Sequence, residues 1–223
     1  MCLVSLERKP GLGLGPFTFG MPICEAITNI EQDTNNYNVL QLKYYGEEPL
    51  MFDILINFLE LGFELQFEPY SQQLRLIDVF DVQCIKMSYE NYLICGPNTA
   101  TFAIVYDACG PTYPRSYDTN MRIYALFYQA LSFSFPIPPQ YEYCVDHQVE
   151  LTLDFFDRKT LVTSCICIYD KSNGSVGVGA SLNKSILPLL LAGSLSMEEV
   201  HANLVNEIWF NVGGQHLPFG ASP

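Results

Sequence analysis

Basic residues are scarce in this chain. Its 223 residues include 11 Lys and Arg against 24 Asp and Glu, so the formal net charge at pH 7 is −13. A surface of that sign repels nucleic-acid phosphates and the anionic headgroups of membranes. The composition therefore argues against a nucleic-acid partner and predicts that the isolated chain does not bind anionic membranes directly.

Long apolar runs are missing as well. The longest, ILPLLLAG from Ile186, is shorter than the roughly 20 residues that cross a bilayer as a helix, and it contains Pro188. The N-terminal MCLVSLERKP lacks the apolar stretch of a secretory signal. These two absences predict a cytoplasmic protein without direct membrane insertion.

Cysteine pairs of the Cys-x-x-Cys type do not occur, although the chain has 8 cysteines. Scattered cysteines in a cytoplasmic protein are expected to be reduced thiols. Cys165 and Cys167 alternate with isoleucines in TSCICIYD, so on a strand their side chains lie on one face. Such a pair can contribute to a metal site, but no second pair or histidine motif accompanies it. The sequence therefore predicts small buried thiols, no metal and no cofactor.

Catalytic motifs are equally scarce. The three histidines are His147, His201 and His216, and no G-x-S-x-G motif occurs. Asp146-His147 is adjacent in the sequence, and a small-ligand-binding or hydrolytic site around it is one alternative hypothesis. The favoured interpretation places this pair in a solvated loop. We therefore predict a protein that is not an enzyme and has no catalytic residues.

The stretch FTFGMPICEAITNI raises the question of a phosphate-binding loop, because Gly20 separates a strand-like segment from a helical one. Such loops carry several glycines and a Lys or Arg, whereas Met21 and Pro22 follow here. Proline also lacks the amide donor that would hold an anion. The segment therefore predicts a helix start, with an apolar stripe at helical spacing formed by Ile23, Ala26, Ile27 and Ile30.

Aromatic and aliphatic residues are abundant, with 15 Phe, 14 Tyr and an apolar share of 49%. They alternate with polar residues in segments typical of strands, which we expect at 39–45, 51–67 and 74–80. The second segment reads as a hairpin turned at Gly62, with Phe63, Leu65 and Phe67 on one face and Glu64 and Gln66 on the other. A helix over 50–61 is the alternative for its first arm.

A second unit of the same order follows the first. A helix is expected over 98–111, and a hairpin over 121–136 ends in alternating Phe and Ser. A third helix is expected over 194–208. We therefore predict an α+β fold, mostly β, built from repeated helix-plus-antiparallel-sheet units. Residues 1–16 would form a flexible leader, 17–140 two units, and 141–223 a β-rich segment ending in a helix and an incomplete third unit.

One loop differs from the alternating segments. PIPPQYEYC carries Tyr141 and Tyr143 after three prolines, a composition that suits contact with a partner. A packed linker between units is the competing interpretation of this loop.

Four blocks of the sequence resemble successive segments of the phagosome assembly factor family. They are GMPICEAI (20–27), LQFEPYSQQLRLIDV (65–79), GPTYPRSYD (110–118) and ALSFSF (130–135), and they occur in the family's order. Members of the family are longer, so the chain resembles the N-terminal part of one, in a shortened or divergent form.

The resemblance implies a non-enzymatic regulator or adaptor of autophagy. Such a protein would act at the phagophore assembly site with a WD-repeat β-propeller partner, which would recruit it from the cytoplasm. An alternative role in the family is a vesicle-sorting factor in Golgi-to-plasma-membrane transport, located at the trans-Golgi network. The resemblance assigns no catalytic or binding residue.

Overall fold

A computed structural model describes residues 4–5, 8–9, 11–33, 37, 39–44, 49–89, 92–95, 100–112, 115–118, 121–139, 161–170 and 206–211. These residues form mostly antiparallel sheet together with two α-helices, which confirms the predicted α+β fold class. No helix within the described ranges is long and apolar enough to span a membrane.

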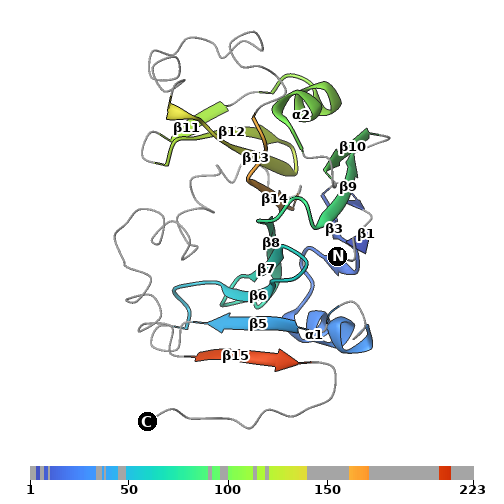
Figure 1. The fold of residues 1–223 in the computed structure, drawn as a ribbon. Helices are drawn as coiled ribbons and strands as arrows, with labels where there is room; N and C mark the ends of the chain where they lie inside the picture. Colours follow the sequence, from blue (N-terminus) through green and yellow to red (C-terminus); the bar gives the residue numbers. More distant parts are fainter. Residues whose placement is uncertain are drawn as a thin grey trace.

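The main element is a nine-stranded sheet with the strand order β11-β12-β13-β14-β8-β7-β6-β5-β15 (Figure 1). All neighbouring strands in it are antiparallel. Both predicted units contribute to this one sheet, because β14 pairs with β8. The strands are β5 (Val39–Tyr44), β6 (Ile54–Phe58), β7 (Phe63–Phe67), β8 (Leu74–Val79), β11 (Arg115–Asp118), β12 (Ile123–Tyr128), β13 (Leu131–Pro136), β14 (Cys165–Tyr169) and β15 (Asn206–Asn211).

Two small sheets, absent from the sequence-based expectation, accompany the large one. The first has the order β2-β3-β4 and the second β1-β9-β10, in which β1 and β9 are parallel. Their strands are β1 (Val4–Ser5), β2 (Arg8–Lys9), β3 (Gly13–Leu14), β4 (Phe17–Thr18), β9 (Ile85–Tyr89) and β10 (Tyr92–Cys95).

The expectation of a flexible leader over 1–16 is corrected by these strands. Among its described residues, 4–5, 8–9 and 13–14 lie in strands, and Leu14 is fully buried, as is Phe17 just after the segment. Gly13 has φ +148°, and a Cβ there would lie 1.9 Å from the carbonyl oxygen of Phe17. Gly13 thus permits close approach of neighbouring strands, a role of glycine that composition alone does not distinguish from a flexible segment.

Helix α1 (Ile23–Gln32) starts directly after the Gly20 turn, as predicted. Gly20 has φ +79°, and its amide donates to the carbonyl of Leu74 at 2.9 Å. The amide of Ile23 donates to the carbonyl of Gln72 at 2.9 Å, so these amides anchor the helix to β8 and to the turn before it, and they are not available to an anion. Of the predicted stripe, Ala26 and Ile30 are buried, whereas Ile27 is exposed.

Helix α2 (Phe102–Cys109) begins at a side-chain cap. Thr101 Oγ1 accepts a hydrogen bond from the amide of Ile104 at 3.3 Å, which satisfies one free donor of the first turn. Gly110, with φ +78°, ends the helix, and its amide donates to the carbonyl of Tyr106. Glycine adopts this backbone conformation without the strain of a side chain.

The first hairpin turns at Gly62, as the sequence predicted. Ile54 pairs with Phe67 and Phe58 with Phe63, around a turn in which Gly62 has φ +73°. The alternative of a helix over 50–61 is therefore wrong, because residues 54–58 form a strand. The second hairpin, between β12 and β13, pairs Ile123 with Pro136.

Both helices pack on the same face of the large sheet (Figure 1), which we call the core face. Rows of cross-strand pairs supply that face, for example Ile56, Leu65, Ile77, Ile168 and Leu131. Aromatic rings fill the space above it, with Phe58 and Phe63 stacked at 4.4 Å between ring centroids. Ala26 and Ile30 of α1 and Phe102 and Val105 of α2 cover it.

The C-terminal end of the expected third helix is corrected. Residues 206–208 are the start of strand β15, which pairs along its whole length with the edge strand β5. Ile208, Trp209 and Phe210 are β-branched or aromatic, and an unpaired strand edge offers their backbone a full ladder of hydrogen bonds. The remainder of the expected helix lies outside the described residues.

Candidate functional site

The opposite face of the large sheet carries a continuous row of polar side chains. Successive cross-strand partners on this face are Gln41, Asn57, Glu64, Asp78, Cys167 and Ser132, which we call the polar row. Gln41, Asn57, Asp78 and Ser132 are each at most 6% exposed. Buried polar groups need partners, so this row is where the fold departs most from a simple hydrophobic core.

Two thiols and a carboxylate meet near the middle of the polar row. Cys165 and Cys167 lie on the same side of β14, and Asp78 lies opposite Cys167 on β8. Cys165 Sγ donates to Asp78 Oδ1 at 2.7 Å, Cys167 Sγ lies 3.7 Å from the same oxygen, and the two sulfurs are 3.7 Å apart. All three ligand atoms fall within 4.8 Å of one another. We call Asp78, Cys165 and Cys167 the thiol–carboxylate cluster.

Burial and the hydrogen bonds among its members set the electrostatics of this cluster. It raises the pKa of Asp78, and the hydrogen bonds from the two thiols oppose that shift only in part. The hydrogen bond to Cys167, then burial and the charge of Asp78, raise the pKa of the Cys165 thiol well above its ordinary value. Among the described residues, no Lys or Arg forms an ion pair with Asp78. The cluster thus contains potential anions that no ion pair with a described Lys or Arg balances.

Glu64 extends this acidic environment to β7. Burial and, next, the charge of Asp78 raise the pKa of Glu64 to about 7, although a hydrogen bond from Gln66 lowers it. The amide Nε2 of Gln66 donates to Glu64 Oε1 at 2.7 Å. The Gln66 Oε1 and Asn57 Oδ1 atoms are buried and have no hydrogen-bond partner among the described residues. Near neutral pH, Glu64 therefore exchanges its proton within a sparsely satisfied polar layer.

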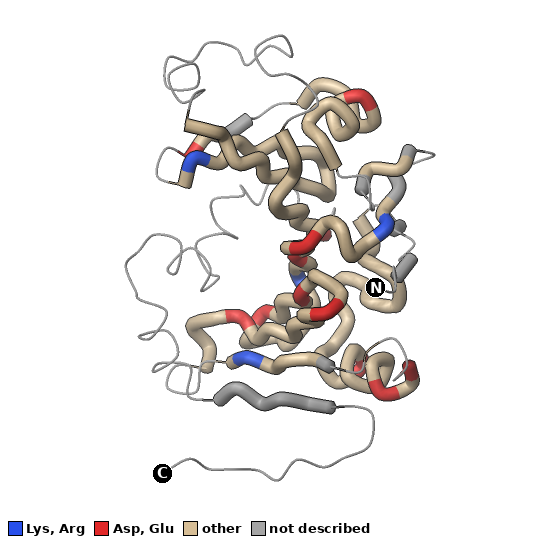
Figure 2. The backbone as a smooth tube through the Cα atoms, in the orientation of Figure 1, with Lys and Arg blue, Asp and Glu red and all other residues tan. Residues whose placement is uncertain are grey.

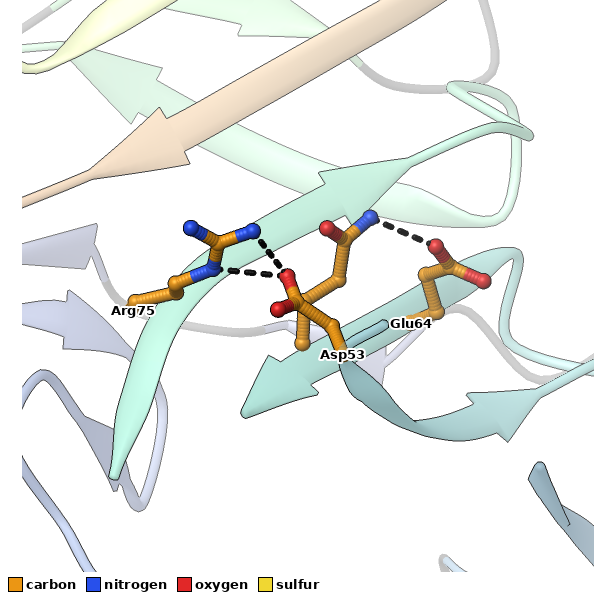
Figure 3. A network of polar contacts seen from close by, with 4 residues as sticks. Asp53, Glu64 and Arg75 are labelled. Carbon is orange, nitrogen blue, oxygen red and sulfur yellow. Dashed lines mark hydrogen bonds and ion pairs between the residues drawn. The ribbon is translucent and has the colours of Figure 1, made fainter. Parts of the chain in front are cut away.

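An ion pair joins the start of β6 to β8, as Figure 3 shows. Arg75 Nε donates to Asp53 Oδ2 at 2.6 Å, and Arg75 Nη2 contacts the same oxygen. Asp53 is 4% exposed. A register shift between β7 and β8 places Arg75 for this contact. Gln66 pairs with Leu76 and Phe67 with Leu74, so Arg75 is the extra residue of a bulge.

The structure describes only some of the predicted site residues. Tyr141, Tyr143, Asp146 and His147 lie outside the described residues. Cys165 and Cys167 do occupy one face of a strand, as predicted.

The predicted environment of these two thiols is corrected. Small buried thiols were expected, whereas both are partly exposed and both approach Asp78. With Cys24, Cys84 and Cys109, they are free of disulfides. Ile166 and Ile168, and not the cysteines, face the core.

Sequence reasoning missed the polar row. The alternation in β7 correctly put Glu64 and Gln66 opposite the phenylalanines, but polar residues on that face are usually solvated. The signal lay in the pairing of β8 with β14, which joins residues 87 positions apart. Without that pairing, Asp78 and Cys165 have no reason to be considered together.

Comparison with known proteins identifies the family of the chain. Residues 13–221 match the family described as phagosome assembly factor 1, PHAF1. The chain belongs to this family. It is 51% identical over 220 residues to a PHAF1 protein of Arabidopsis thaliana, covering 97% of the chain and 54% of that relative.

Animal relatives are more distant. A PHAF1 protein of Drosophila melanogaster is 30% identical over 176 residues, covering 77% of the chain and 40% of the relative. One of Caenorhabditis elegans is 36% identical over 121 residues, covering 54% and 29%. The chain thus spans about half the length, or less, of these relatives. No solved structure matches it significantly.

The family name describes an assembly factor and not a reaction. Along the described backbone, Figure 2 shows Asp and Glu positions on α1 and on the strands β6 to β8, where Asp53 and Asp78 are buried.

Proposed function

We propose that this chain is a non-enzymatic adaptor of autophagy that acts at the phagophore assembly site with a WD-repeat β-propeller partner. Membership of the phagosome assembly factor 1 family over residues 13–221 is the observation that carries the proposal. The protein would be cytoplasmic and would reach the phagophore membrane through its partner. A formal net charge of −13 supports such indirect recruitment, because it opposes binding to anionic lipids.

One end of the large sheet suits a protein contact. The turn before β6 and the turn between β7 and β8 lie at the same end, since Ile54 pairs with Phe67 and Phe67 with Leu74. These turns expose Leu50, Met51 and Tyr70, with exposed fractions of 63%, 56% and 83%. Large apolar side chains gathered at one end suit an interface, and the formal net charge of −13 favours a basic face of the propeller.

Co-purification of the tagged chain from starved and fed cells tests this proposal. We expect the WD-repeat protein to be recovered from starved cells, and the variant Leu50→Ser/Met51→Ser/Tyr70→Ser to lose it. The control Leu12→Ser/Leu93→Ser/Ile104→Ser changes the same number of exposed apolar residues elsewhere and should retain it. Recovery of vesicle coat or tethering proteins in place of the propeller would contradict the autophagy role.

Vesicle flotation separates direct from indirect recruitment. The pure chain should not float with vesicles containing anionic phosphoinositides at physiological salt, and it should float once the propeller is added. Flotation of the pure chain that depends on the phosphoinositide would contradict indirect recruitment.

A further inference from the structure

We infer that the thiol–carboxylate cluster of Asp78, Cys165 and Cys167 is a binding site for a thiophilic divalent cation, with Zn²⁺ as the fitting ion. The inference is independent of the proposed function. It rests on the positions of three ligand atoms from two strands, all within 4.8 Å of one another.

The spacing of the two sulfurs matches tetrahedral coordination. Two thiolates that bind zinc at about 2.3 Å in a tetrahedron stand about 3.8 Å apart. The Sγ atoms of Cys165 and Cys167 are 3.7 Å apart without a disulfide. The carboxylate oxygen Asp78 Oδ1 lies 3.7 Å from one sulfur and 2.7 Å from the other. A modest outward shift of Cys165 completes the arrangement.

The chemistry of the donors fits the same ion. Thiolate and carboxylate together suit zinc, and Glu64, the cross-strand neighbour of Asp78, or water can take a fourth position. Both thiols coordinate as thiolates, so their protons pass to solvent when the ion binds. Asp78 is buried and has no ion-pair partner among the described Lys and Arg side chains. A bound cation would supply the missing positive charge.

The site would lie at the junction of two halves of the large sheet, which we call the seam. Its ligands come from β8 and β14, which join the half formed by β5 to β8 with the half formed by β11 to β14. A metal bridge across this seam links residues that are 87 positions apart in the sequence. Metal occupancy would thus control how firmly the two halves are held together.

Titration of the metal-free, reduced chain with Co²⁺ tests the site. We expect one Co²⁺ per chain, with thiolate-to-cobalt charge-transfer absorption that Zn²⁺ abolishes. Cys165→Ser/Cys167→Ser should lose the absorption entirely. Cys84→Ser is the matched control, because Cys84 Sγ also donates to a carboxylate, Asp81, at 3.2 Å, but belongs to no group of metal-ligand atoms among the described residues. Loss of the signal in Cys84→Ser, or no stoichiometric cobalt in the unmodified chain, would overturn the inference.

Alkylation of the unmodified chain covers the case in which the variants fail to fold. With Zn²⁺, peptide mass spectrometry should show Cys165 and Cys167 alkylated at least about tenfold more slowly, while exposed Cys24 reacts at an unchanged rate. Zinc at a hundredfold excess over its Kd should raise the Tm by roughly 5–10 °C. Unchanged alkylation of both cysteines, or a Cys165–Cys167 disulfide in the protein as isolated, would overturn the site.

Discussion

The two faces of the nine-stranded sheet are both buried near its middle, yet their contents differ. The core face holds cross-strand rows of Ile, Leu and Phe beneath two helices. The polar row on the other face holds an amide, two carboxylates and a thiol in consecutive positions: Asn57, Glu64, Asp78 and Cys167. Apolar burial stabilises any fold, whereas buried polar groups stabilise it only with partners. We therefore assign stability to the core face and functional chemistry to the polar row.

Truncation on the core face should produce the largest loss of stability. Phe63 is fully buried and stacks on Phe58, so Phe63→Ala should lower the free energy of unfolding by about 3–5 kcal/mol. Urea unfolding measures this loss. Phe80→Ala, one residue beyond β8, is the control and should have a small effect because Phe80 is 40% exposed. Equal losses for the two variants would contradict the assignment of the core face.

Glu64 should make the polar row sensitive to pH. Its pKa is raised from 4.5 to about 7, so between these values the folded chain keeps a proton that the unfolded chain has lost. The free energy of unfolding should therefore fall as the pH rises from 4.5 to 7 and should stay low above pH 7. Glu64 accounts for up to about 3 kcal/mol of this fall.

The variant Glu64→Gln isolates this dependence. Measured in chelator, it should gain stability over the unmodified chain at pH 8, and the gain should vanish near pH 4.5. A gain that does not change with pH would show that Glu64 is not protonated in the folded chain at neutral pH.

The turn at Gly62 sets which residues face which side. A Cβ there would lie 2.6 Å from Asp81 Cβ at φ +73°, whereas a Cβ at Gly20, with φ +79°, has nothing within 4 Å. Gly62→Ala should therefore cost roughly 2 kcal/mol or more, and Gly20→Ala only about 1 kcal/mol, the strain of the positive φ. Thermal unfolding compares them. Equal costs would mean that the turn tolerates a side chain beside Asp81.

The smallest effect should come from Asn57, whose buried Oδ1 has no hydrogen-bond partner in the described part of the chain. Asn57→Leu should be neutral or raise stability by about 1 kcal/mol, because it removes an unsatisfied polar group. Asn57→Asp should lower stability, since it adds a carboxylate beside Glu64. Urea unfolding at pH 8 distinguishes the two variants. A large loss in Asn57→Leu would show that the polar row itself stabilises the fold.

Local sequence patterns predicted the parts of the fold that depend on neighbouring residues. The Gly20 helix start, the hairpin at Gly62 and the strand containing Cys165 all follow from alternation and turn chemistry within a few residues. The core side of β7 was predicted for the same reason. Family membership was also predicted, from four ordered blocks.

Long-range pairing decided what sequence patterns missed. Strand β15 forms because the edge of β5 is available to it, and helical spacing up to Ile208 carries no information about that edge. The polar row depends on β14 joining β8 across a long intervening segment. The candidate site therefore appears only in the assembled sheet.

The central claim is that the thiol–carboxylate cluster acts through a bound cation, whereas the core face acts through packing alone. The Tm values of the unmodified chain, Cys165→Ser/Cys167→Ser and Phe133→Ala, measured in Zn²⁺ and in EDTA, test it most directly. We predict that the cysteine variant melts below the unmodified chain in Zn²⁺, that this deficit disappears in EDTA, and that the deficit of Phe133→Ala is the same in both. A cysteine-variant deficit that persists unchanged in EDTA would contradict the claim.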